Sequence, residues 1–219
     1  MKEEMIDYQK VSNKVICVGK NYLDHAKEMN AAVPTEPLLF TKPWTAVTPI
    51  REKINIPVDK GSVHHELEIA YVIGETLVNA SEAQVEQSIA GIGLALDLTL
   101  RDVQTKLKEK GYPWSKSKGF DLSCPIHAVP TNGIDVKYDD IEISLIKNGQ
   151  QQQQGNSADM IFKTIELISY MSSWFTLNAG DIILTGTPAG VSPLVTGDEL
   201  SLSLQMAGKE ILYVDTLVA

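Results

Sequence analysis

Three acidic residues, Glu66, Glu68 and Asp97, have the types and spacing that could hold a metal ion. Glu66 and Glu68 fall in a segment that alternates apolar and polar residues, so a strand there would send both carboxylates to one face. Asp97 lies in an apolar run that begins at Gly91, where a carboxylate without a partner would be costly to bury. Carboxylate oxygens with no cysteine nearby suit Mg²⁺, Mn²⁺ or Ca²⁺ better than zinc.

Spacing alone leaves other interpretations of these acids open. A Glu-x-Glu pair on a strand is most often part of a solvated outer face. His65 and Asp102 are alternative ligands by their position in the sequence. If the three carboxylates do bind a cation, three protein ligands leave coordination positions for water and substrate.

His25 and Glu28 form a second candidate group, three residues apart. On a helical turn such a pair shares one face, so the carboxylate could orient the imidazole and stabilise its protonated form. That arrangement makes a general base. The alternative is a surface helix with scattered charges such as Asp24 and Lys27.

A lysine and a tight turn complete the candidate chemistry. Lys118, flanked by glycine and aromatic residues, could present a cation to an anionic substrate, and Lys116 is an equally good candidate on local grounds. Gly186 and Thr187 follow a predicted strand, where backbone N–H groups and hydroxyls could hold a carboxylate. The same turn could simply end the strand.

The elements expected to position these residues are mostly strands, because the segments are β-branched or alternating and are bounded by Gly, Pro or Asp. Strands are predicted at 15–18, 37–40, 67–73, 181–185, 200–204 and 211–214. After the alternating segment 141–146 and the turn Asn148-Gly149, the glutamines 150–154 are predicted to form the returning arm of a hairpin or an exposed loop, and no function is expected for them. Helices are predicted at 81–89, 97–110 and 159–173. Strands grouped around a few short helices predict a β-rich α+β fold and disfavour a doubly wound sheet.

Composition excludes several classes of partner. The chain has 219 residues, with 19 basic and 28 acidic side chains, and this net charge of −9 disfavours nucleic acid and anionic membranes as partners. The N-terminus carries acids where a signal peptide needs a basic start, and no apolar stretch is long enough to cross a bilayer. We therefore expect a cytoplasmic protein with one catalytic domain over residues 1–219, in which 1–14 form an N-terminal extension.

Taken together, the motifs resemble those of the fumarylacetoacetate hydrolase family from about Val15 to Val214. The resemblance is carried, in this order, by Gly19-Lys-Asn-Tyr-x-x-His, Lys42-Pro, His65-Glu-x-Glu, Asp97-x-Thr-x-Arg-Asp-x-Gln, Lys118-x-Phe-Asp and Asp181-x-Ile-x-Thr-Gly-Thr-Pro-x-Gly-Val. It is closest to the short, single-domain acylpyruvate hydrolases, some of which act on oxaloacetate as decarboxylases or tautomerases. The family fold is a mixed β-roll or β-sandwich and is commonly dimeric.

The resemblance also implies roles for individual residues. It implies Mg²⁺ or Mn²⁺ as the cation held by the three acids, and it makes His25 and Glu28 a base dyad on a segment that closes over substrate. It favours Lys118 over Lys116 as the active-site lysine. The residues implied to bind substrate are Arg101, Gln104, Gly186 and Thr187.

These expectations lead to a predicted reaction. The leading hypothesis is metal-dependent hydrolysis of the C–C bond of acylpyruvates, with His25 activating the attacking water and a homodimer as the assembly. The alternative at the same site is an oxaloacetate decarboxylase or tautomerase, or a related keto-acid isomerase. A hypothesis of another class is a non-catalytic binding module that the metal stabilises.

Overall fold

The computed structural model describes residues 14–28 and 32–219, whose strands form three sheets. A seven-stranded sheet has the order β2-β1-β11-β5-β6-β8-β3, a four-stranded sheet the order β10-β9-β13-β14, and a three-stranded sheet the order β12-β4-β7. The large sheet contains β1 (Val15–Gly19), β2 (Leu38–Lys42), β3 (Val47–Pro49), β5 (Leu67–Ile73), β6 (Ile89–Leu96), β8 (Cys124–Pro130) and β11 (Ile182–Leu184). The other two contain β4 (Val63–His65), β7 (Thr99–Leu100), β9 (Ile141–Lys147), β10 (Gln150–Asn156), β12 (Ser192–Pro193), β13 (Glu199–Met206) and β14 (Lys209–Leu217).

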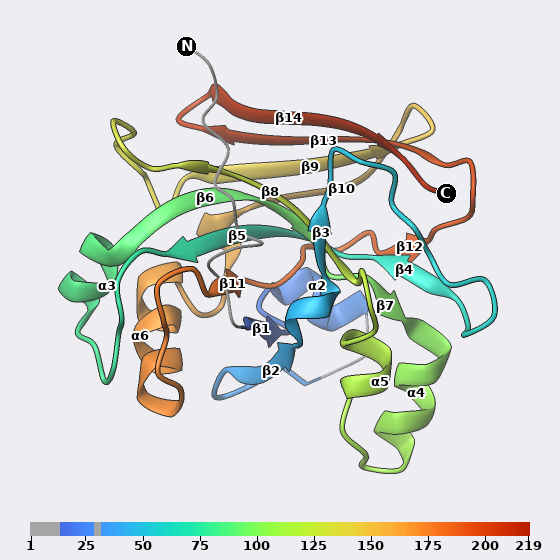
Figure 1. Cartoon of the computed structure of the whole chain (residues 1–219), viewed down its shortest axis with the longest axis horizontal. Helices are drawn as coiled ribbons and strands as arrows, with labels where there is room; N and C mark the ends of the chain where they lie inside the picture. The colour runs from blue at the N-terminus through green and yellow to red at the C-terminus, as the bar shows by residue number, and fades with distance from the viewer. Residues whose placement is uncertain (1–13, 29–31) are drawn as a thin grey trace.

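The large sheet is strongly curled, and the four-stranded sheet packs against its convex side (Figure 1). Apolar side chains that alternate along β5 and β6 join those of β9 and β13 in one buried cluster, which contains Ile69, Tyr71 and Leu94. The opposite, concave face has a smaller apolar cluster that includes Ala70 and Ala95. Both faces of β5 are therefore covered, and all seven of its residues are buried.

Short helices lie at the edges of the curled sheet (Figure 1). The helices are α2 (Leu23–Glu28), α3 (Glu82–Ser88), α4 (Arg101–Glu109), α5 (Ser115–Lys118) and α6 (Thr164–Trp174), with 3₁₀ turns at Trp44–Ala46 and Ser157–Asp159. In Figure 1, α3 and α6 flank one end of the sheet while α4 and α5 lie together at the other, with α2 between them inside the curl. None of the described helices is long and apolar enough to cross a lipid bilayer.

The predicted β-rich α+β fold is confirmed, and the differences are local. The helix expected over 97–110 begins only at Arg101, because Thr99 and Leu100 pair with β4 as a short strand. The helix expected over 159–173 begins at Thr164, after a 3₁₀ turn. The predicted 150–154 arm is strand β10, which pairs with β9. The predicted N-terminal extension lies outside the described residues except for Lys14.

Candidate active site

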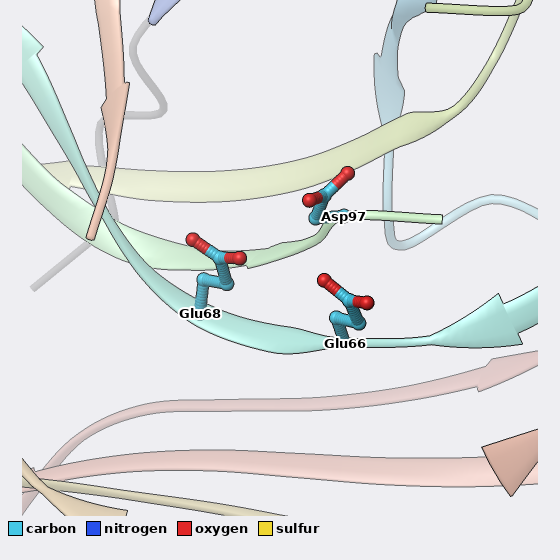
Figure 2. A group of neighbouring side chains, drawn as sticks. All are labelled: Glu66, Glu68 and Asp97. Carbon is cyan, nitrogen blue, oxygen red and sulfur yellow. The ribbon is translucent and has the colours of Figure 1, made fainter. Parts of the chain in front are cut away.

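Glu66, Glu68 and Asp97 meet on the concave side of the large sheet (Figure 2). Glu66 immediately precedes β5, and Asp97 follows β6, the strand that pairs with it. The Asp97 N–H donates to the Glu66 carbonyl at 2.8 Å, which ties the ends of the two strands together. One ligand oxygen from each carboxylate lies within 4.8 Å of the others, and all three side chains are buried. The interpretation of Glu66 and Glu68 as a solvated face is therefore wrong.

The two alternative ligands lie elsewhere. Both ring nitrogens of His65 are occupied, with Nδ1 2.8 Å from Gln153 Oε1 and Nε2 2.7 Å from Ser192 Oγ. Burial lowers the pKa of His65 to about 4, so the ring is neutral at neutral pH. Asp102 is exposed and accepts from the Ser62 N–H at 3.1 Å.

Basic side chains surround two of the three acids. Lys118 Nζ donates to Glu66 Oε2 at 2.7 Å and also to Asp97 Oδ2, while the Arg101 guanidinium donates to Glu66 Oε1. Lys118 is buried at the end of α5, whereas Lys116 is exposed. Of the two lysines that the local sequence left open, Lys118 is therefore the one at the acids.

Lys42 is a member of this site to which the sequence reasoning gave no role. It ends β2, is fully buried, and places Nζ 2.7 Å from Asp97 Oδ1. The same ammonium donates to the carbonyl oxygens of Lys118 and Ser123. A buried ammonium is stable only with such partners. In the sequence, the one signal for this residue was its place in the Lys42-Pro motif.

Glu68 differs from the other two acids because none of the described basic side chains pairs with it. Its Oε2 accepts only the Gly186 N–H, at 2.6 Å. Burial, together with Asp97 and Glu66, raises the pKa of Glu68 well above its ordinary value. By contrast, although burial alone would raise it, Lys118 and Arg101 hold the pKa of Glu66 below its ordinary value.

This arrangement fits a divalent cation. Asp97 Oδ1 is ion-paired with Lys42 Nζ at 2.7 Å in a geometry that forms no hydrogen bond, and Glu68 has no basic partner among the described residues, so negative charge at this point of the site is only partly matched. Three hard oxygen donors at this spacing match Mg²⁺ or Mn²⁺ coordination, with sites left for water or substrate. A bound cation would offset the repulsion from Asp97 and Glu66 that, after burial, raises the pKa of Glu68.

The His25–Glu28 pair forms as the spacing predicted. On α2, His25 Nδ1 lies 2.9 Å from Glu28 Oε2, and Glu28 Oε1 accepts the Gly190 N–H at 3.0 Å. Asn21 holds the start of this segment through its side chain, which donates to the Thr185 carbonyl at 2.9 Å and accepts from the Phe162 N–H at 2.8 Å. His25 is buried, so the alternative of a solvated surface helix does not describe its imidazole.

The side chain of Gln153 holds the predicted substrate-binding turn at Gly186 and Thr187 in place. Its Oε1 accepts the Leu67 N–H at 2.9 Å, and its Nε2 donates to Thr187 Oγ1 at 2.8 Å and to the Pro188 carbonyl at 2.9 Å. Gln153 of the glutamine tract therefore links the strand that carries Glu68 to the turn, a structural role that the sequence reasoning did not assign. Gly186 uses its N–H for Glu68.

One cavity brings these groups together. Its lining contains the three acids, His25, Lys118, Arg101, Gln104 and Thr187. Gln104 is oriented by Arg101, whose Nη1 donates to Gln104 Oε1 at 2.8 Å. The remaining lining residues are Val18, Gly19, Lys20, Phe40, Lys108 and Trp114. A small anionic molecule would meet acids, a base and several cations here.

Comparison with known proteins gives a consistent result. Residues 14–213 match the family model described as fumarylacetoacetate (FAA) hydrolase, C-terminal. The chain is 54% identical over 200 residues to an oxaloacetate tautomerase of Escherichia coli, covering 91% of this chain and 90% of that protein. It is 43% identical over 191 residues to the mitochondrial oxaloacetate tautomerase of Homo sapiens, covering 87% and 86%.

Solved structures agree in fold. A fumarylacetoacetate isomerase/hydrolase homologue from Oleispira antarctica superposes with a TM-score of 0.92 at 52% identity, over 95% of this chain and 94% of that one. A fumarylpyruvate hydrolase from Pseudomonas aeruginosa, solved with Mn²⁺ and pyruvate, superposes with a TM-score of 0.85 at 32% identity, over 95% and 91%.

Proposed function

We propose that this chain, which belongs to the fumarylacetoacetate hydrolase family, is a divalent-cation-dependent tautomerase of oxaloacetate. The observation that carries the proposal is that His25, with Nδ1 2.9 Å from Glu28 Oε2, lines the same cavity as the three buried acids. Keto–enol exchange needs a base near the carbon next to a ketone and a way to stabilise negative charge on oxygen. The 54% identity to an oxaloacetate tautomerase supports the same substrate.

Glu66, Glu68 and Asp97 would hold the cation. When bound, it would supply Lewis-acid polarisation of the 2-oxo group, which makes the neighbouring C–H more acidic. Lys42 and Lys118 hold the Asp97 carboxylate in place from two sides. The protein thus fixes the orientation of the acids before a cation or substrate arrives.

His25 is the proposed proton carrier. Because Glu28 occupies Nδ1, Nε2 is the nitrogen left to accept a proton. In the direction from ketone to enol, Nε2 takes one proton from C3, the C–H electron pair forms the C2–C3 double bond, the C2=O π pair moves to the oxygen, and the imidazolium then gives its proton to that oxygen. The sum of these steps moves one proton from carbon to oxygen, and Glu28 stabilises the imidazolium between them.

Three polar side chains would stabilise the oxygen that gains charge. Lys118 is buried among acids that, against the effect of burial, raise its pKa above the ordinary value, so it stays an ammonium. Arg101 and Gln104 lie on the same wall and are hydrogen-bonded to each other. Donors that are already oriented stabilise a developing oxyanion without reorganising.

A second candidate is hydrolysis of an acylpyruvate or fumarylpyruvate. It is favoured by the similarity to the hydrolase that was solved with Mn²⁺ and pyruvate. There, His25 would deprotonate a water that attacks the distal carbonyl, and the C–C bond would break to leave pyruvate and a carboxylic acid. Decarboxylation of oxaloacetate is a third outcome and needs no attacking water.

A panel of substrates separates these reactions. Oxaloacetate, fumarylpyruvate and acetylpyruvate are assayed with Mg²⁺ or Mn²⁺, and kcat/KM is obtained for enol loss, pyruvate release and CO₂ release. The proposal expects enol–ketone exchange of oxaloacetate to have the largest kcat/KM. A larger value for pyruvate release from either diketo acid would make the protein a hydrolase. Binding of Mn²⁺ with no turnover of any substrate would indicate a non-catalytic module.

A further inference from the structure

The rim of the active-site cavity carries two lysines that the proposed reaction does not use, Lys20 and Lys108. Both line the cavity. Lys20 is half-buried directly after β1, and Lys108 is exposed in the last turn of α4. Within residues 14–28 and 32–219, neither ammonium lies at ion-pair distance from a carboxylate. Their charges are therefore open to a ligand.

Helix α4 aims three side chains at the cavity. Arg101, Gln104 and Lys108 stand at i, i+3 and i+7, which is one face of a helix, and all three line the cavity. Side chains on a helix lean towards its N-terminus, so the long Lys108 side chain leans back towards the turn of Arg101. Lys106 lies on the same helix but is exposed and does not line the cavity.

An aromatic wall connects the acids to this rim. Lys118 Nζ lies 5.1 Å from the centre of the Phe40 ring. The Phe40 and Trp114 rings meet edge to face with centroids 5.9 Å apart. Lys108 Nζ in turn lies 5.1 Å from the centre of the Trp114 ring. The cavity thus has a cation at each end of one continuous wall, and the ring faces favour both cations where they stand.

The charges of the lining favour an anion at the rim. Four cationic side chains (Lys20, Arg101, Lys108 and Lys118) face three carboxylates, and a divalent cation would add two further positive charges. Partial burial, followed by the charge of Arg101 and those of Lys20 and Lys118, lowers the pKa of Lys108 to about 8, against the opposite effect of Glu66. An anion beside Lys108 would remove this repulsion.

We propose that Lys108, with Lys20 at the same rim, binds the second carboxylate of a dicarboxylic keto acid and so selects dicarboxylates over monocarboxylates. This inference rests on the proposed function, since it takes the first carboxylate and the 2-oxo group to lie at the three acids. The subsite gives a physical reason why oxaloacetate, with a carboxylate at each end, would be preferred to a keto acid with an apolar end.

The test compares two unreactive ligands that differ only at the far end. Malate and lactate share a carboxylate and a 2-hydroxyl, and malate adds the second carboxylate. Calorimetry on the full chain loaded with Mn²⁺ gives the affinity for each ligand in the unaltered protein, in Lys108→Met and in the matched control Lys106→Met. We expect Lys108→Met to weaken malate about tenfold to a hundredfold and lactate less than about threefold, with no effect of Lys106→Met.

Lys20→Met provides a second variant, expected to weaken malate in the same direction by a smaller factor. Equal weakening of malate and lactate by Lys108→Met, or no weakening of malate, would overturn the inference. Binding needs no turnover, so the result is independent of the reaction. Suppose that Lys108→Met loses malate binding selectively, but the unaltered protein does not interconvert the enol and ketone forms of oxaloacetate. That result would support the carboxylate subsite and would reject only the proposed function.

Discussion

The lysines at the floor of the cavity, where the three acids lie, are buried and ion-paired, whereas the lysines at its rim are not. At the floor, Lys42 and Lys118 are almost fully buried and both contact Asp97. At the rim, Lys20 and Lys108 remain accessible to water and make no ion pair with any described residue. The floor balances most of its charge within the protein, whereas the rim leaves its charge for something that binds.

This difference separates two tasks. Buried charges are costly unless they are paired and hydrogen-bonded, so the floor must be built as a complete network to hold three acids in one orientation. An exposed cation loses little hydration free energy when the protein folds, so it needs no partner within the protein and is available to bind a ligand. We therefore expect changes at the floor to affect cation binding and stability, and changes at the rim to affect only the choice of substrate.

The largest effect is expected from Glu68→Gln, which removes the one acid of the floor that has no basic partner. Loss of a charged ligand should abolish tight Mn²⁺ binding and lower kcat/KM for oxaloacetate by more than about 10³-fold. The apo protein should become no less stable, because the change relieves repulsion with Glu66 and Asp97. Mn²⁺ titration and thermal unfolding measure these effects, and Glu86→Gln, at an exposed position, is the control.

The next effect is expected from His25→Gln, at the boundary between floor and rim. Loss of the proton carrier should lower kcat for enol–ketone exchange by about 10²- to 10³-fold. Mn²⁺ affinity should change less than about twofold, because the hydrogen bond that His25 makes is to Glu28 and not to one of the three acids. Unchanged kcat with bound Mn²⁺ would remove His25 from the mechanism.

Gln153→Leu tests whether the floor of the cavity depends on the hydrogen bonds that Gln153 makes from β10. The change leaves the buried Leu67 N–H without its acceptor and removes the donor to Thr187 Oγ1 and to the Pro188 carbonyl, so the free energy of unfolding should fall by about 2–3 kcal/mol. Gln151→Leu, on the exposed part of the same strand, should cost less than about 0.5 kcal/mol. Urea unfolding of both variants makes the comparison, and equal losses would contradict it.

The smallest effect is a pH dependence confined to the rim. Lys108 has a pKa of about 8 among Arg101, Lys20, Lys118 and Glu66, so it is charged below that pH and loses its proton above it. Malate affinity should therefore fall about tenfold as pH rises from 7 to 9, whereas lactate affinity should show no matching fall. In Lys108→Met the difference between the two ligands should not vary over this range.

The sequence predicted the parts of this comparison that depend on local spacing. Alternation put Glu66 and Glu68 on one face, and the three-residue spacing put His25 beside Glu28; both are found in the structure. These features follow from the periods of strands and helices. The resemblance to the family added the order of the motifs and distinguished Lys118 from Lys116.

Contacts between distant segments could not be predicted in the same way. Lys42 meets Asp97 only because β2 and β6 belong to one curled sheet, and Gln153 reaches Leu67 from the other sheet. No neighbour in sequence marks the role of Gln153, and Lys42 is marked only by its place in the Lys42-Pro motif. The late start of α4 has the same origin, since Thr99 pairs with His64 of β4 and so delays the helix.

Enol–ketone exchange of oxaloacetate, followed by the loss of enol absorbance, tests the central claim most directly. The chelator-treated protein is measured before and after Mn²⁺ or Mg²⁺ is restored, and each rate is compared with the metal ion alone. The account predicts rapid exchange only with protein and cation together, and recovery of the full rate when the cation returns. The full rate in excess chelator, or a rate no higher than that of the free ion, would contradict it.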